Sequence, residues 1–562
     1  MITSTHPTGD SYKSMVPWLA ALFLVVLGAK LWVVQLYGSP LPLWDQWYEA
    51  ELFFRPWLEG HLTWKDFFAP YCEHRIFFTR LLDLSVIKLN GRWEPLLQMT
   101  VNAFIFATYA CGLACCLWEV QGRKSGWLIC FLLAPFFALP YASENTIWAF
   151  NSQAYLLAIF SLATLAGLGF GKPGSGWWWF GLITAVLGLF TMASGLLAPA
   201  AIAGLAVLRA IKRRRMDRGN VVALGSCLAV TVLGAFLTVS YEGDRLLRAH
   251  NFAEFSSALA RNLAWPFFSA PETAGLIILP LALLAVLYFR PSFAESRPAE
   301  FLLVLGLWSG LQSIALAYGR GNFGEAVPAS RYMDKLNVLV IASLFAVVLL
   351  SRSSSHARFS TWAGRLLPLI FAAVIFSGLC RVSQIVMVDL LVPTRMMTLV
   401  AEERVETFMA TGNEQEMLES PTVRPSPEVA LLTLRDPKFR AILPAICLPP
   451  ADAHLTGRFS AVSQWLLRNS TGILYCGLGL FAGLMGCALV RSPLGLAWDN
   501  LPAGIAFLAL LAALGFVWSM APVKRETIER DLDARLTAYF KSVGNHKRAA
   551  IFEHKAGMPK NQ

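Results

Sequence analysis

The sequence predicts an all-α polytopic membrane protein, and two observations lead to this fold class. Hydrophobic residues make up 56% of the 562-residue chain, charged residues only 15%, and the mean hydropathy is +0.53. This composition lies well outside the globular range and excludes a water-soluble fold. Apolar runs of about 20 residues also recur along the chain, and about 20 helical residues cross a hydrocarbon core of roughly 30 Å.

The first apolar run, residues 15–37, is too long for a removable signal peptide and lacks a small-residue cleavage site, so we expect it to remain as the first span. About thirteen spans are predicted in all: 16–37, 95–118, 127–142, 150–169, 177–193, 195–211, 220–240, 274–290, 300–318, 336–350, 366–388, 471–490 and 501–520. The short runs 177–193 and 195–211 leave open one broken or re-entrant element in place of two spans.

The net charge of +11 indicates membrane topology and not nucleic-acid binding, because Lys and Arg cluster in short loops between apolar runs. Residues 212–218 form the clearest cluster. Basic loops are expected on the cytoplasmic side, and the others are the N-terminus with Lys13, residues 121–126, 290–297 and 351–365, and Arg491.

Two segments expected on the outer side are long enough to carry function. In residues 38–94, the run 76–89 fits an amphipathic helix lying along the membrane interface. In residues 389–470, helical stretches near 401–409 and 428–435 are separated by prolines, which indicates a small folded elaboration.

The polar tail, residues 521–562, contains a predicted amphipathic helix over 526–540. Lys524 and Arg525 favour the cytoplasm for this tail, whereas the span count places it outside. Eight of the ten cysteines fall in or beside apolar runs. Cys72 and Cys447 lie in the two long outer segments, and a disulfide between them stays open.

Candidate site residues gather in the first outer segment. Asp45 lies between Trp44 and Trp47 at the expected membrane boundary, and the alternative is an interfacial tryptophan belt with Asp45 capping the next helix. Glu73, His74 and Arg75 follow one another before the amphipathic run, where Glu73 could simply favour the positive end of a helix.

Further candidates lie in two later connections. Glu144 occupies a short turn between apolar runs, either as a functional carboxylate or as the neighbour of a helix cap. Arg320 lies between Gly319 and Gly321, and Arg331 and Tyr332 follow at the next span. Arginine matches phosphate oxygens and glycine lets backbone amides approach them, although Arg331 could instead snorkel from its helix.

This arrangement resembles the GT-C superfamily of membrane glycosyltransferases, which use polyprenyl-phosphate-linked sugars as donors. The resemblance rests on the early acidic residue in Trp44-Asp45-Gln46-Trp47, on His74-Arg75 before the next helix, and on the segment 319–332, which looks like one in uncharacterised bacterial members. It implies a GT-C-like fold in the bacterial inner membrane, with the active site facing the periplasm or outside. The partners would be the lipid-linked donor, a glycan, lipid or protein acceptor, and membrane lipids.

If the resemblance holds, Asp45 acts as general base on the acceptor hydroxyl, and Arg320 and Arg331, together with Arg75, stabilise the leaving phosphate. No cofactor is indicated. The first outer segment has no Asp-x-Asp pair, so a divalent metal stays open, and the one such pair, Asp531 with Asp533, falls in the tail. A transporter or flippase for a lipid-linked glycan is the main alternative, and a non-catalytic assembly subunit is a third.

Overall fold

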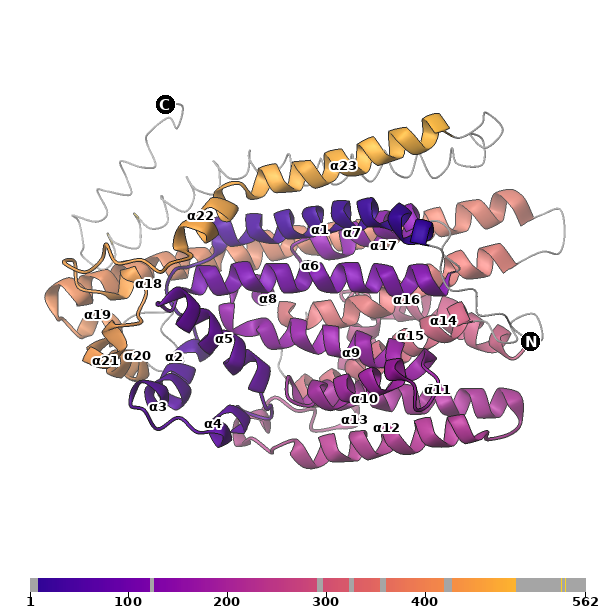
Figure 1. Ribbon diagram of the computed structural model, residues 1–562, viewed down its shortest axis with the longest axis horizontal. Helices are drawn as coiled ribbons and strands as arrows, with labels where there is room; N and C mark the ends of the chain where they lie inside the picture. The colour runs from indigo at the N-terminus through magenta and orange to yellow at the C-terminus, as the bar shows by residue number, and fades with distance from the viewer. Residues whose placement is uncertain are drawn as a thin grey trace.

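The computed structural model describes residues 9–121, 126–290, 297–322, 328–353, 360–418 and 427–491, together with Thr537 and Lys541. Within these residues the secondary structure is helical, with no β-strand and a single isolated bridge between Tyr71 and His74. The predicted fold class, an all-α polytopic membrane protein, is confirmed (Figure 1).

Ten described helices are long and apolar enough to cross a membrane. They are formed by α1 (Gly9–Tyr37), α6 (Pro95–Val120), α9 (Ser152–Phe170), α11 (Leu197–Arg213), α12 (Arg218–Leu237), α14 (Ala274–Tyr288), α15 (Arg297–Arg320), α16 (Ser330–Ser353), α17 (Ser360–Ile385) and α23 (Ser470–Arg491). Two apolar helices, α7 (Gly126–Ala138) and α10 (Gly176–Gly188), are shorter.

Ten of the thirteen predicted spans correspond to these ten helices, and the runs 127–142 and 177–193 correspond to the shorter α7 and α10. The thirteenth, 501–520, and nearly all of the tail lie outside the described residues. The predicted runs 177–193 and 195–211 form two separate helices, α10 and α11, joined through the short η3 (Ala193–Leu196). Gly188 and Gly195 meet at this junction, where an added Cβ at Gly195 would lie 2.1 Å from the Gly188 carbonyl oxygen. The absence of side chains therefore lets the two segments turn tightly against each other.

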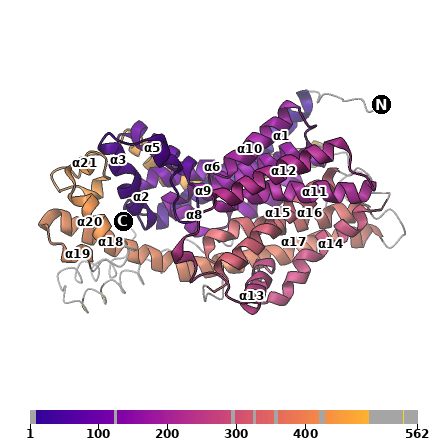
Figure 2. The same cartoon turned by 90° about the horizontal axis from the view of Figure 1, so that it is seen from below.

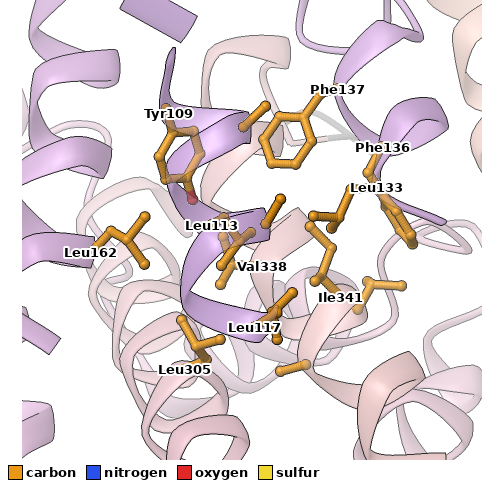
Figure 3. Close-up of a cluster of buried hydrophobic side chains, with 14 of the residues drawn as sticks. Tyr109, Leu113, Leu117, Leu133, Phe136, Phe137, Leu162, Leu305, Val338 and Ile341 are labelled. Carbon is orange, nitrogen blue, oxygen red and sulfur yellow. The ribbon is translucent and has the colours of Figure 1, made fainter. Parts of the chain in front are cut away.

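The bundle core is built from aliphatic and aromatic side chains on α6, α7, α9, α15 and α16 (Figure 3). Leu113 and Leu117 of α6 face Leu133 and Phe137 of α7, with Val338 of α16 beside them. Helices in lipid associate through close packing, since lipid tails are as apolar as these side chains. This packing fixes the ends of α15 and α16, from which several site residues project.

The two long non-spanning segments form one head at a single end of the bundle (Figures 1 and 2). The first contributes α2 (Asp45–Glu49), η1 (Ala50–Phe54), α3 (Arg55–Leu58), α4 (Trp64–Phe68) and α5 (Phe77–Asn90). The second contributes α18 (Val392–Thr411), α19 (Gln415–Leu418), α20 (Pro427–Arg435), α21 (Pro437–Arg440), η8 (Ala445–Cys447) and α22 (Ser460–Arg468). The basic connection between α11 and α12 lies at the opposite end of the bundle (Figure 1).

The head has its own hydrophobic core, to which both segments contribute. Its segments are also joined by hydrogen bonds, including one from the Trp93 amide to the Ile442 carbonyl at 2.6 Å. Cys447 is buried in this core whereas Cys72 lines a cavity, and neither is joined in a disulfide, so the pairing left open by the sequence is not formed.

Two predicted features of the head differ from the structure. The helix predicted over 76–89 is present as α5, but its Arg80 and Asp83 are buried and do not form a solvated polar face. The second segment was expected to leave the membrane as a loop at Asp389, yet α17 continues through the π-helical η7 (Val386–Leu391) into α18. Within the resulting helix, the stretch Leu366–Thr411 alone has 46 residues, about 69 Å at the usual rise, and so extends well beyond one bilayer.

Candidate active site

A cavity of about 660 Å³ lies where the head meets the bundle, within the size range of small-molecule sites. Its walls come from α2, the turn at residues 71–74, the start of α9, η3, the connection after α12, and the ends of α15 and α16. Six charged side chains line it: Asp45, Glu73, Arg248, Arg320, Arg331 and Lys335. Four cations therefore face two carboxylates, which favours an anionic ligand.

Asp45 is the first residue of α2 and lies half-buried in the cavity wall. Burial raises the pKa of its carboxyl group, while a hydrogen bond with Tyr71 and the charge of Arg331 act in the opposite direction. A carboxylate with a raised pKa is a stronger base than an exposed one and suits proton abstraction near neutral pH.

The turn carrying Glu73 and His74 is closed by a two-way backbone bridge between Tyr71 and His74, with Cys72 at a φ of 48°. His74 Nδ1 accepts a hydrogen bond from the Ala193 amide at 3.2 Å, which fastens the head to η3. Because Nδ1 is an acceptor, the ring proton of neutral His74 is on Nε2, and this atom lies 3.6 Å from Glu73 Oε1.

Arg331 is hydrogen-bonded to Glu144, which belongs to the short helix α8 (Ser143–Ile147). The carboxylate accepts from the Arg331 amide at 2.8 Å, from the Arg331 guanidinium at 3.1 Å and from the Ser330 hydroxyl at 3.1 Å. Glu144 thus caps the N-terminus of α16, where unpaired amides and the helix dipole favour a negative group. Glu144 does not line the cavity itself.

Arg320 ends α15 and joins the head to the bundle across the cavity. Its guanidinium donates to Glu73 at 3.0 Å and to the Tyr332 hydroxyl at 3.2 Å. The Arg331 guanidinium lies 4.8 Å from the centroid of the Tyr332 ring. Lys335, one turn further along α16, approaches the Met192 sulfur at 3.5 Å and also lines the cavity.

The bundle also contributes apolar side chains to the cavity lining. They are Met192, Leu196, Leu197, Ala315, Leu316 and Leu336. These residues belong to the ends of α11, α15 and α16 or to the link before α11, so the cavity reaches from the head into the ends of the spans. A lining that combines charged and apolar side chains matches an amphipathic ligand with an anionic group.

Six of the eight predicted site residues line this one cavity: Asp45, Glu73, His74, Arg320, Arg331 and Tyr332. Glu144 supports the site through Arg331, as described above. Arg75 does not line the cavity, because its guanidinium donates to the carbonyls of Leu237 and Phe68 and so ties the first outer segment to the end of α12.

The predicted glycine-rich loop differs from the structure, since Gly319 and Arg320 form the last turn of α15. Gly324 and Glu325 lie outside the described residues. The sequence pattern did not predict Tyr71 and Lys335 as site residues. Lys335 is one turn beyond Arg331 on the same helix, and this spacing was a usable signal.

Among the described residues, no group of three or more His, Cys, Asp or Glu side chains is placed to hold a metal ion. The Asp531–Asp533 pair of the tail lies outside those residues. In comparisons with known proteins, no family model, curated protein or solved structure matches this chain.

Proposed function

We propose that the protein is a glycosyltransferase that moves a sugar from a polyprenyl-phosphate-linked donor to a glycan, lipid or protein acceptor of the cell envelope. The observation that carries this proposal is the cavity itself, which is lined by Asp45, by the cations Arg320, Arg331 and Lys335, and by apolar side chains from the ends of the spans. A lipid-linked sugar phosphate combines an apolar tail, an anionic group and a polar ring. The cavity offers apolar side chains for the tail, cations for the anionic group and a base for the transfer.

In the proposed reaction, the acceptor hydroxyl attacks the anomeric carbon of the donor sugar. Asp45 takes the hydroxyl proton while the new carbon–oxygen bond forms. The bond between the anomeric carbon and the phosphate oxygen breaks, and its electron pair leaves with the polyprenyl phosphate. Arg320, Arg331 and Lys335 stabilise the negative charge that develops on that phosphate.

Mass spectrometry of lipid-linked sugars and surface glycans in host cells tests the proposal. Wild type, a deletion and Asp45→Asn are compared at matched protein levels, with Asp452→Asn as control because Asp452 is an exposed head carboxylate away from the cavity. The deletion and Asp45→Asn should both lose one glycosyl unit and accumulate its polyprenyl-phosphate donor, whereas Asp452→Asn should resemble wild type. A deletion that leaves every glycan and lipid-linked sugar unchanged would sink the proposal.

A transporter or flippase of a lipid-linked glycan is the second candidate, and one observation favours it. Lys30 is 2% exposed inside α1, with its ammonium 4.6 Å from the Phe106 ring centroid and Asp334 as its electrostatic partner. Ionisable groups buried within spans are common in transport pathways. Transport is the better account if the deletion traps a complete glycan on its carrier, Lys30→Met does the same, and Asp45→Asn behaves like wild type.

A further inference from the structure

Two tryptophans of the cavity wall are stacked on each other beside Asp45. Trp44 of the first outer segment and Trp148, which follows α8, have ring centroids 5.5 Å apart and an interplanar angle of 27°. The Arg331 guanidinium lies 5.9 Å from the Trp148 centroid. The stack therefore connects the residue before the proposed base to the cation cluster.

Trp44 keeps a large open surface although it lies in this stack. Its side chain is 38% exposed and lines the cavity. Its backbone has a φ of 53° and a ψ of −118°, a conformation that is strained for a residue with a side chain. The fold thus holds an indole at the cavity surface in a strained backbone position, directly before Asp45.

The cavity lining also contains buried polar atoms without a hydrogen-bond partner in the described part of the chain. Gln153, in the first turn of α9, is 8% exposed, and its Oε1 is one of them. The indole nitrogen of Trp148 and the hydroxyl of Ser194 are two others. All three residues line the cavity. An unsatisfied buried polar atom destabilises the fold, and a hydroxyl-bearing ligand in the cavity would offset that loss.

We propose that this wall is a pyranose-binding subsite, in which the open face of Trp44 stacks on the sugar ring and Gln153 accepts a hydrogen bond from a ring hydroxyl. The inference rests on the proposed function and names the part of the cavity that recognises the sugar. A pyranose presents C–H groups on its faces and hydroxyls around its edge. The electron-rich face of an indole complements the first, and unpartnered polar atoms complement the second.

The subsite is separate from the phosphate-binding cations on α15 and α16. A ring stacked on Trp44 is placed beside Asp45, since the two residues are adjacent in the chain. The phosphate joined to that ring then has Arg331 nearby, because the Arg331 guanidinium lies 5.9 Å from the centroid of Trp148, the ring stacked on Trp44. Sugar recognition and phosphate recognition are consequently expected to respond to different substitutions.

The test is native mass spectrometry of the full-length protein in lipid nanodiscs, titrated with two kinds of probe. One is bare polyprenyl phosphate, and the other is the same lipid carrying a single glucose, galactose, mannose or N-acetylglucosamine. The variants are Trp44→Leu, which removes the aromatic face, Trp44→Phe, which keeps one, and Gln153→Leu. Trp64→Leu is the control, because Trp64 of α4 is 72% exposed and does not line the cavity.

Wild type should bind at least one glycosylated lipid more tightly than the bare lipid. Trp44→Leu and Gln153→Leu should weaken the binding of that glycosylated probe by about fivefold or more. Their affinity for the bare lipid should stay within about twofold of wild type. Trp44→Phe should retain most of the preference and Trp64→Leu all of it. Retained binding of the bare lipid by Trp44→Leu and Gln153→Leu excludes misfolding as the cause of their weaker sugar binding.

The inference is overturned if Trp44→Leu binds both probes as wild type does, if it weakens both equally, or if wild type prefers none of the four sugars. Failure of the proposed function has a different signature. In that case wild type binds neither the bare nor the glycosylated lipid, and both the proposed function and the subsite are refuted.

Discussion

Glu144 accepts hydrogen bonds from both the backbone amide and the guanidinium of Arg331, at 2.8 and 3.1 Å. One carboxylate therefore fixes the start of α16 and the direction of its first cationic side chain. Because Glu144 itself lies outside the cavity lining, we assign it as a positioning residue for the proposed reaction. A residue in this role orients Arg331, so its loss should affect turnover more than it affects binding of an anionic donor.

Glu144→Gln should lower turnover of the lipid-linked donor by about tenfold while donor binding stays equal or becomes tighter. The amide keeps an acceptor for the Arg331 backbone but loses the charge that orients the guanidinium, and the cavity becomes more positive. Donor accumulation in cells reports turnover, and native mass spectrometry reports binding. Glu272→Gln is the control, since Glu272 is exposed and away from the cavity. Unchanged turnover in Glu144→Gln would contradict the positioning role.

The pH dependence of the reaction should report Asp45. A general base must be ionised, so the transfer rate should rise with pH through a pKa above the ordinary aspartate value. The hydrogen bond from Tyr71 stabilises the ionised form and lowers this pKa. Tyr71→Phe removes it, and the acid side of the rate profile should then move to higher pH.

The transfer rates of purified wild type and Tyr71→Phe are compared from about pH 4 to about pH 9, a range that includes raised carboxyl pKa values. Tyr475→Phe serves as control, because Tyr475 is 60% exposed on α23. A Tyr71→Phe profile that coincides with wild type, or that moves to lower pH, would remove Asp45 as the titrating base.

The helical fold was predictable because its signal is local. A run of about 20 apolar residues has few alternatives to a membrane-spanning helix, and ten predicted spans have matching helices long enough to cross a membrane. The candidate site was predictable in part for a related reason, as Asp45 and Arg331 are charged residues next to apolar runs. Their placement around one cavity depends on helix packing, which the sequence pattern does not contain.

Burial in the head was not predictable in the same way. Arg80 and Asp83 fall on the polar side of α5 by pattern, and the sequence therefore indicated a solvated face. Arg80 is buried with Glu49, 31 positions earlier, as its partner, and Asp83 is buried with a hydrogen bond to Gln98. Pairing across such a separation leaves no periodic trace. The continuation of α17 into α18 was missed for another reason, since the charged residues after Asp389 end the apolar run without ending the helix.

The Arg80–Glu49 pair should dominate the stability of the head. Two guanidinium nitrogens donate to Glu49 at 2.7 and 2.8 Å, and both side chains are at most 5% exposed. Arg80→Met strands the Glu49 carboxylate in the interior, which costs about 3–5 kcal/mol when one partner of a buried pair is removed. Thermal unfolding followed by size-exclusion chromatography should show a clear drop in Tm.

Two further variants make this prediction specific. The double variant Arg80→Met with Glu49→Gln should recover part of the loss, because no unpaired charge remains buried. Arg55→Met should cost less than Arg80→Met, since the Arg55–Glu51 pair is partly exposed. Equal losses for Arg55→Met and Arg80→Met would refute the importance assigned to burial.

Asp83 should make the head less stable as pH rises. Burial and the neighbouring Glu49 charge raise the pKa of its carboxyl group well above the ordinary value, while a hydrogen bond with Gln98 acts in the opposite direction. The folded state therefore keeps a proton that the unfolded state releases near its ordinary aspartate pKa of about 4. Linkage requires stability to fall as pH rises from that value through the folded pKa.

Asp83→Asn removes this titration and keeps a side chain of similar shape, so Tm should rise relative to wild type at pH 8 (roughly neutral to mildly alkaline). Asp66→Asn is the matched control of opposite sign. Its carboxylate accepts from the Thr63 amide and hydroxyl, which lowers its pKa and makes its ionised form stabilising. Asp66→Asn should therefore lower Tm at the same pH. A fall in Tm for Asp83→Asn across the whole pH range would show that Asp83 is ionised in the folded head and stabilises it.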